Sequence, residues 1–151
     1  MSSHSREVAI FEQCANIERM ASYARPSSTA LLAQARACLR EASRCADSGE
    51  RFSLSHLAAL RAAAAVVAER GRPASTRRRL ISVWVLLDSM APELREWAAL
   101  FAAGAPLRAA VEAGAYNAVS SRQADDQYRA AGEFLVLVED LLGVLAEPLA
   151  S

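Results

Sequence analysis

The chain of 151 residues contains no lysine, so its 17 basic side chains are all arginine, and 17 acidic side chains balance them. Because the formal net charge is zero, no overall field attracts the protein to a nucleic acid or a membrane. Any contact with a polyanion must therefore come from a local group of arginines. Aromatic residues are scarce, at 6%, although hydrophobic residues make up 53%. Alanine and leucine dominate the apolar share, which favours closely packed helices over sheets.

Familiar motifs for cofactors and catalysis are also missing. There is no G-x-x-x-x-G-K loop, H-E-x-x-H pair, paired C-x-x-C or G-x-S-x-G turn, which disfavours dinucleotide, zinc and α/β-hydrolase chemistry. Cys14, Cys38 and Cys45 lack metal-ligand spacing, and no apolar leader precedes them. We therefore expect a cytoplasmic protein without metal or cofactor, with these cysteines in the core. The longest charge-free run, at 97–107, is about half of what a bilayer requires, so we expect no membrane span.

The first half of the chain carries the signals of three helices. The segment 5–23 places apolar residues loosely on one face but starts without a cap, which predicts a frayed helix. A second helix is predicted after the break at Pro26, because capping residues follow and apolar residues then recur at spacings of four and three. These residues are Leu31, Ala35, Cys38, Ala42 and Cys45. The turn at 47–49 predicts a third helix that folds back antiparallel and ends near Arg70.

The second half predicts further helices separated by proline and glycine. Ser82 can cap a short apolar segment, and Pro92 fits the first turn of the helix that follows. Pro106 predicts a restart or a kink before Gly114. A final helix after 120–121 has the most regular apolar spacing in the chain. Its stripe consists of Ala124, Tyr128, Ala131, Leu135, Val138, Leu142 and Leu145.

These patterns together predict an all-α protein. No segment alternates apolar and polar residues as a strand does, and no repeat of solenoid period is visible. Short connections and long apolar stripes favour an antiparallel helical bundle of about four or five helices. Trp84 and Trp97 lie at helical spacing among leucines, so we expect them in the core rather than on a base-stacking surface.

The stretch RFSLSH, at 51–56, combines a permanent cation with one of only 2 histidines. A histidine titrates near neutrality and can take a proton from a ribose 2′-hydroxyl, while a guanidinium can hold the phosphate whose charge grows in the transition state. Arg51 and His56 therefore offer the pair of groups that metal-free RNA cleavage needs. The helix N-terminus and the guanidinium both disfavour the imidazolium, so we expect a neutral His56 at pH 7.

Plainer interpretations of both residues stay open. Residues five apart point about 140° away from each other on a helix, so Arg51 and His56 converge only if the arginine swings from the first turn or a second protomer adds its own pair. Arg51 can instead pair with Glu50 or Asp47. His56 can be a half-buried helix residue that bonds a neighbouring carbonyl.

A second basic feature is the segment GRPASTRRR at 71–79, which contains helix breakers and four arginines. We expect it to form an exposed loop. Its arginines are candidate substrate-binding residues that would grip a phosphate backbone, and a merely solvated cluster is the alternative. They are Arg72, Arg77, Arg78 and Arg79.

Three stretches of the chain resemble the HEPN domain superfamily, in particular a small actinobacterial family of stand-alone HEPN proteins. They are ERFSLSHLAALRAAAAVVAERGRP at 50–73, SVWVLLDSMAPELREWAALFAAGA at 82–105 and AVSSRQADDQYRAAGEFLVLVEDLLG at 118–143. The resemblance covers about 29–145. It implies a variable, partly helical N-terminal extension at 1–28, an HEPN-like helical bundle at 29–146 and a C-terminal tail at 147–151.

The resemblance also implies a function. Many HEPN domains cleave RNA without metal through an arginine, a hydrophobic or polar residue, three variable residues and a histidine, a pattern that Arg51, Phe52 and His56 match. Active members form one composite site in a dimer. The resemblance therefore implies a homodimer in which His56 is the general acid or base and Arg51 holds the phosphate of RNA, and, in some relatives, an antitoxin-type protein partner. Inactive members bind a protein or nucleotide partner instead, and the motif lies earlier in this bundle than in many active toxins.

Overall fold

A computed structural model describes residues 26–71 and 81–143 of the chain. Within these ranges it contains five α-helices and no β-strand. The helices are α2 (Ser28–Arg44), α3 (Ser48–Arg70), α4 (Val83–Met90), α5 (Arg95–Glu112) and α6 (Ser121–Leu141), with two short 3-10 helices, η2 (Pro92–Leu94) and η3 (Tyr116–Ala118). The predicted all-α bundle is therefore confirmed. The predicted helix at 5–23 and Leu145 lie outside the described residues.

Polar side chains cap the helices at their first turns. Ser27, Asp47 and Ser82 each accept a backbone N–H at the start of α2, α3 and α4. Ser120 and Gln123 form a reciprocal capping box at the start of α6. Each such cap is worth about 1 kcal/mol to its helix. Local sequence therefore decides where these four helices begin.

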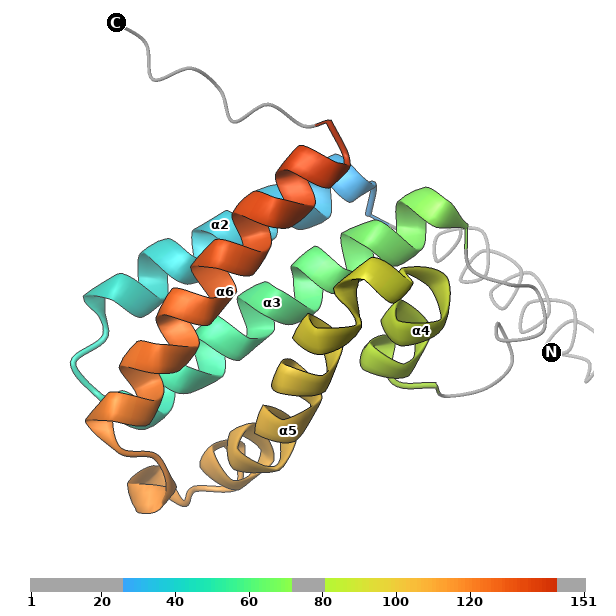
Figure 1. Cartoon of the computed structure of the whole chain (residues 1–151). Coiled ribbons are helices and arrows are strands. Elements are labelled where there is room, and N and C mark those ends of the chain that lie inside the picture. The colour runs from blue at the N-terminus through green and yellow to red at the C-terminus, as the bar shows by residue number, and fades with distance from the viewer. Residues whose placement is uncertain (1–25, 72–80, 144–151) are drawn as a thin grey trace, which may run out of the picture.

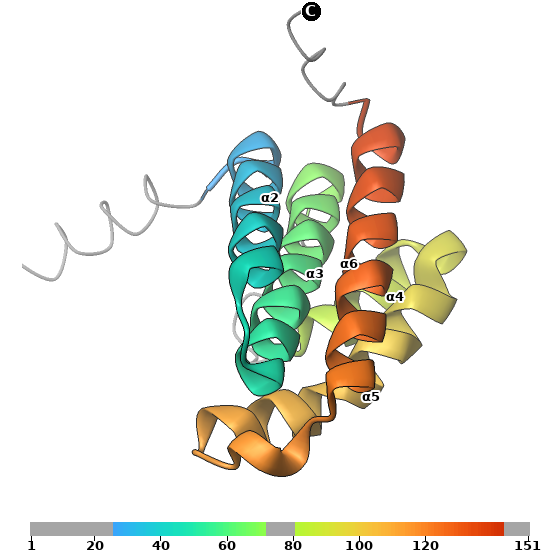
Figure 2. The ribbon, with the colours of Figure 1, turned by 90° about the vertical axis from the view of Figure 1, so that its left-hand side faces the viewer.

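The helix α3 is central and contacts each of the other four. Figure 1 shows α2 and α6 along one side of α3, and α4 and α5 along the other. In Figure 2, α2, α3 and α6 run side by side while α5 crosses beneath them. The helix α3 also has the length and the mean hydropathy, 1.2, of a membrane-crossing helix, but 56% of its most apolar window is buried in the bundle, as in any core helix.

The two sides of α3 are packed with different side chains. Toward its neighbours, α3 presents fully buried alanines, namely Ala58, Ala59, Ala62, Ala63 and Ala65. Such small residues let helices approach closely. On the α2 and α6 side, the Nε atom of Arg36 donates to Oε2 of Glu139 at 2.9 Å, and a second guanidinium nitrogen donates to the other carboxylate oxygen. This bidentate pair joins α2 to α6 and satisfies the buried Glu139.

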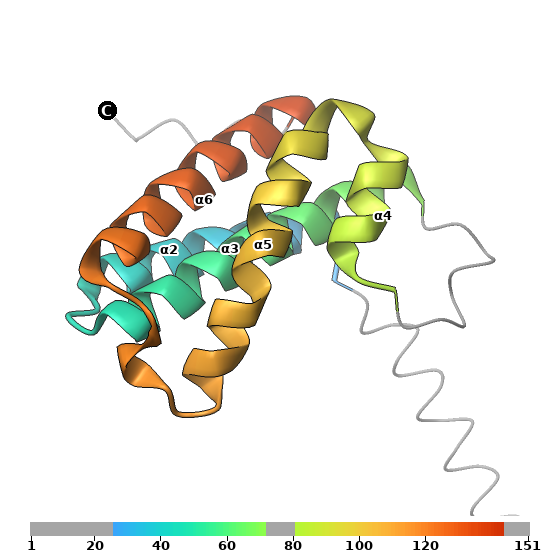
Figure 3. The same ribbon diagram turned by 60° about the horizontal axis from the view of Figure 1, so that its bottom comes forward.

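Aromatic rings fill the opposite side, where α4 and α5 lie together (Figure 3). Trp84, Trp97, Phe101 and Phe134 form a connected group with ring centroids 5.3 to 6.2 Å apart. Trp84 is buried, and Trp97 is partly buried against the same core. The prediction that both tryptophans belong to the core is confirmed.

Three details differ from the sequence-based expectation. Of the two outcomes predicted at Pro106, a restart or a kink, the restart is wrong, because α5 continues through Pro106 to Glu112. The buried Phe101 and Val111 anchor α5 on both sides of the proline, and this packing outweighs one lost backbone hydrogen bond.

In α6, Tyr128 is exposed and Gln127 is buried in its place. Both positions lie one turn after Ala124, and it is the Gln127 side chain that lies beside Gly104 of α5. Of the cysteines, Cys38 is buried, Cys45 is only half-buried just past the end of α2, and Cys14 lies outside the described residues.

Candidate functional site around His56

The arginine of the RFSLSH stretch lies in the first turn of α3 and points toward α6. Its Nε and Nη2 atoms donate to the carbonyl of Cys45 at 3.2 and 2.9 Å, and Nη1 donates to the carboxylate of Asp125. Arg51 thus ties the turn between α2 and α3 to the first turn of α6. Its carboxylate partner comes from a distant helix and is neither of the sequence neighbours, Glu50 and Asp47, that the plainer interpretation allowed.

This ion pair is open to replacement by another anion. The side chain of Arg51 is 19% exposed and that of Asp125 is 56% exposed. An ion pair with such access to water contributes on the order of 1 kcal/mol or less. A phosphate that offers two oxygens to the same guanidinium can therefore compete with Asp125.

The histidine of the same stretch leaves α3 toward α5 and is only 1% exposed. Its Nε2 lies 2.9 Å from the carbonyl oxygen of Phe101. The ring stacks on Phe52 with centroids 6.5 Å apart and meets Trp84 edge-on at 5.7 Å. The plainer interpretation, a bond from His56 to a carbonyl, is therefore present, but the carbonyl belongs to another helix and the burial of His56 is nearly complete.

The carbonyl partner decides the tautomer of His56. A carbonyl oxygen can only accept, so Nε2 carries the hydrogen in the neutral ring and Nδ1 keeps its lone pair. Burial is the largest influence on the pKa of His56 and lowers it; the Phe101 carbonyl raises it, Arg108 lowers it further and Glu112 raises it. The net direction is downward from about 6.5, so His56 is neutral at pH 7, the form that a general base requires.

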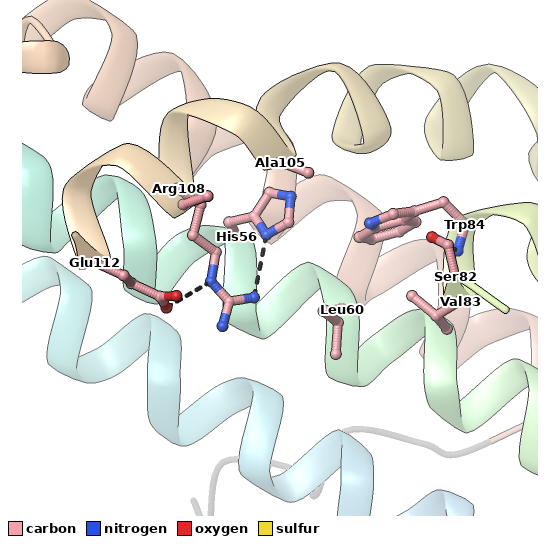
Figure 4. A pocket seen from close by; sticks show the side chains of 9 residues that line it. His56, Leu60, Ser82, Val83, Trp84, Ala105, Arg108 and Glu112 are labelled. Carbon is pink, nitrogen blue, oxygen red and sulfur yellow. Dashed lines mark hydrogen bonds and ion pairs between the residues drawn. The ribbon is translucent and has the colours of Figure 1, made fainter. Parts of the chain in front are cut away.

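Sequence reasoning missed Arg108, a cation that lies beside His56. Nη1 of Arg108 is 3.5 Å from Nδ1 of His56, and its Nε donates to Glu112 at 3.0 Å (Figure 4). The spacing of Arg108 and Glu112 is that of an ordinary i,i+4 surface pair, worth about 0.3 to 0.5 kcal/mol. No sequence signal connects Arg108 with His56, because 52 residues separate them.

These side chains line a pocket of about 360 Å³ between α3, α4 and α5. His56 and Leu60 come from α3, Trp84 from α4, and Arg108 and Glu112 from α5. Figure 4 shows the guanidinium of Arg108 between the imidazole and the carboxylate. The pocket therefore combines a neutral imidazole lone pair with a cation, although the cation is not the one in the RFSLSH stretch.

Other predicted site residues cannot be compared in this way. Arg72, Arg77, Arg78 and Arg79 lie outside the described residues. Across residues 26–71 and 81–143, no group of three or more His, Cys, Asp and Glu side chains is placed to hold a metal ion.

An all-helical bundle whose central helix carries an arginine and a histidine five residues apart has the architecture of an HEPN domain. The model of the SAV_6107-like HEPN family matches residues 42–139, a range that contains α3, α4, α5 and all but the last two residues of α6. The chain belongs to this HEPN family. No curated protein and no solved structure matches the chain.

Proposed function

We propose that this HEPN protein is a metal-independent endoribonuclease in which His56 is the general acid or base and Arg51 is the phosphate-binding cation of a dimeric composite site. The observation that carries the proposal is the state of His56. It is neutral, its Nε2–H is held by the Phe101 carbonyl, and its Nδ1 lone pair borders a pocket.

The reaction follows from these atoms. Nδ1 of His56 takes the proton of a ribose 2′-hydroxyl, whose oxygen attacks the adjacent phosphorus. The bond to the 5′-oxygen of the next nucleotide breaks, and that oxygen receives the proton that His56 took up, which returns His56 to its neutral form and leaves a 2′,3′-cyclic phosphate and a 5′-hydroxyl. A guanidinium stabilises the charge that grows on the phosphate oxygens.

Two contacts within the protomer must give way in this reaction. Arg108 must move from Nδ1 of His56 so that the hydroxyl can reach the lone pair. Arg51 must exchange Asp125 for a phosphate. Because Arg51 and His56 leave α3 on different sides, Arg51 of one protomer must act on RNA that lies in the His56 pocket of the other protomer. Both guanidiniums are held by partly exposed carboxylates, so neither exchange is prohibitive.

A second candidate function is a non-catalytic HEPN module that binds a protein or nucleotide partner. The observation that favours it is the pairing of both motif residues inside one chain: Arg51 with Cys45 and Asp125, and His56 with Phe101. In this alternative the motif residues stabilise the bundle, and the partner binds through the same surface.

Cleavage of a mixed-sequence RNA in EDTA separates the two functions. Under the first, the parent cleaves, His56→Gln loses about 100-fold or more of the rate, and Arg51→Gln loses about tenfold or more. The matched control Arg40→Gln removes an exposed arginine of α2 and keeps the parent rate. Size-exclusion mass checks that each variant keeps the parent assembly.

His56→Gln is chosen because its amide N–H can still donate to the Phe101 carbonyl while the basic lone pair is gone. A folded parent that leaves the RNA intact contradicts the ribonuclease proposal and favours the partner-binding module.

A further inference from the structure

We infer that the pocket beside His56 binds a phosphate group within a single protomer, with Arg108 as its cation. The inference rests on the proposed function in one respect, that the phosphate would belong to RNA. It differs from the proposed function in two ways. The cation is Arg108, which lies outside the RFSLSH stretch, and the site needs no second copy of the chain.

The first argument is the unused hydrogen-bonding capacity of Arg108. A guanidinium has five N–H groups. The Nε–H is used by Glu112, and Nη1 offers one N–H to Nδ1 of His56 at a long 3.5 Å. Among the described residues, no acceptor contacts the remaining N–H groups. Two oxygens of a tetrahedral phosphate can accept side by side from such a planar fork.

The second argument is the strength of the competing carboxylate. The side chain of Glu112 is 55% exposed, whereas that of Arg108 is only 21% exposed. The carboxylate can therefore turn into water while the guanidinium stays in the pocket wall. Exchange of Glu112 for a phosphate keeps the charge of Arg108 paired throughout.

The third argument is the size and lining of the pocket. Its volume of about 360 Å³ lies at the lower end of the range for small-molecule sites, about 300 to 1,000 Å³. A phosphate with one nucleoside fits this size, so the pocket would take one nucleotide of an RNA chain. Ser82, whose oxygen already caps α4, also lines the pocket and has its hydroxyl hydrogen to donate.

The state of His56 makes phosphate binding depend on pH. A lone pair on Nδ1 repels a phosphate oxygen unless a proton lies between them, so binding and proton uptake are coupled. Arg108 and Glu112 of α5 are the charged groups of this pocket, while Ser82 and Trp84 of α4 are uncharged. Because burial lowers the pKa of His56, phosphate affinity should rise as the pH falls below about 6.5, the ordinary pKa of a histidine.

The test is a titration of the full chain with inorganic phosphate, followed by the imidazole nitrogen resonances of His56. The expected result is a saturable shift of the His56 signals, with His4 as a reference in the same spectra. Arg108→Gln should weaken binding at least about tenfold, Arg108→Lys should retain only part of it because an ammonium has no planar fork, and Glu112→Gln should strengthen it. The matched control Arg95→Gln, on the same helix, should bind like the parent.

Equal phosphate binding by the parent and Arg108→Gln overturns the inference, as does a parent whose His56 signals do not move. If Arg108→Gln fails to fold, Glu112→Gln decides, because unchanged affinity in that variant also overturns the inference. The cleavage assay stands apart from this titration. Phosphate binding without RNA cleavage would support the Arg108 site and contradict the ribonuclease proposal. RNA cleavage without Arg108-dependent phosphate binding would support the ribonuclease proposal and contradict the Arg108 site.

Discussion

Arg51 and His56, the two functional candidates of the RFSLSH stretch, lie on one helix, yet their surroundings are opposite in character. Arg51 sits at the edge of the bundle, where water reaches the Asp125 side chain and the partners are polar. His56 sits about one and a half turns later, between aromatic rings and with 1% of its surface exposed. A substitution at the edge removes replaceable polar contacts, whereas a substitution at the aromatic side opens the core.

This comparison teaches that sequence spacing defines a motif but not a site. Five residues turn a helix by about 500°, so the two side chains meet different neighbours. Arg51 finds a carboxylate on α6, and His56 finds a carbonyl and a second arginine on α5. The difference between the two environments should appear in the stability of variants on each side.

The largest effect is expected for Phe101→Ala. Phe101 is fully buried and contacts the rings of Trp84, Trp97 and Phe134. Its loss should lower the free energy of unfolding by about 3 to 5 kcal/mol, measured by urea denaturation. Leu100→Ala, at an exposed position of the same helix, should change it by less than about 0.5 kcal/mol. Similar losses for both variants would show that the aromatic side is not a packed core.

A second large effect is expected for His56→Ala. It opens a cavity and removes the donor from the Phe101 carbonyl, so we expect a loss of about 2 to 3 kcal/mol in the same measurement. His56→Gln should recover part of this loss because its amide can donate to the carbonyl. If His56→Ala is as stable as the parent, the side chains around His56 are packed far less tightly than its burial indicates.

The burial of His56 also predicts how stability depends on pH. The pKa of His56 is lowered in the folded chain, chiefly by burial, so the unfolded chain binds more protons below about 6.5. The free energy of unfolding should therefore fall as the pH drops through this value. The fall in the parent should exceed that in His56→Gln, since that variant cannot titrate at this position. Equal pH profiles would contradict the lowered pKa.

A smaller effect is expected on the arginine side. Arg51→Gln should lower the free energy of unfolding by about 1 kcal/mol, because water replaces its partners at a partly exposed position. A double-mutant cycle with Asp125→Asn should give a coupling energy of at most about 1 kcal/mol. A coupling of 3 kcal/mol or more would mean that the pair is effectively buried and that a phosphate cannot replace Asp125.

The smallest effect is expected for Gly104→Ala, next to the His56 ring. An added methyl group would meet Phe52 at 3.4 Å, His56 at 3.5 Å and Gln127 at 3.7 Å, which is ordinary van der Waals contact. Alanine is favoured over glycine inside a helix by about 1 kcal/mol, so the variant should be neutral or slightly stabilised in thermal unfolding. A marked loss of stability would show that the aromatic side of α3 has no room to adjust.

Much of the fold could be predicted from local patterns. The helix starts at Ser27, Asp47, Ser82 and Ser120 follow from their capping side chains, and the apolar spacing after them predicts helices rather than strands. The exchange of Tyr128 for Gln127 could not be predicted, because both lie near the same face and only packing against α3 and α5 selects between them.

The candidate site was predictable only in part. The RFSLSH stretch is continuous in the chain, so Arg51 and His56 were visible as a possible pair of groups for RNA cleavage. Arg108 and the Phe101 carbonyl were not, since each is more than forty residues from His56 and carries no motif.

The amino-acid sequence by itself determined that this protein is an all-helical HEPN chain, where most of its helices begin, and which two residues carry the family pattern. Capping and apolar periodicity act over a few residues, so they are legible in a single chain. Only the tertiary structure decided that His56 is buried, that its free nitrogen meets Arg108, and that Arg51 turns to Asp125. These contacts depend on how α5 and α6 pack against α3, and that packing is a property of the whole bundle.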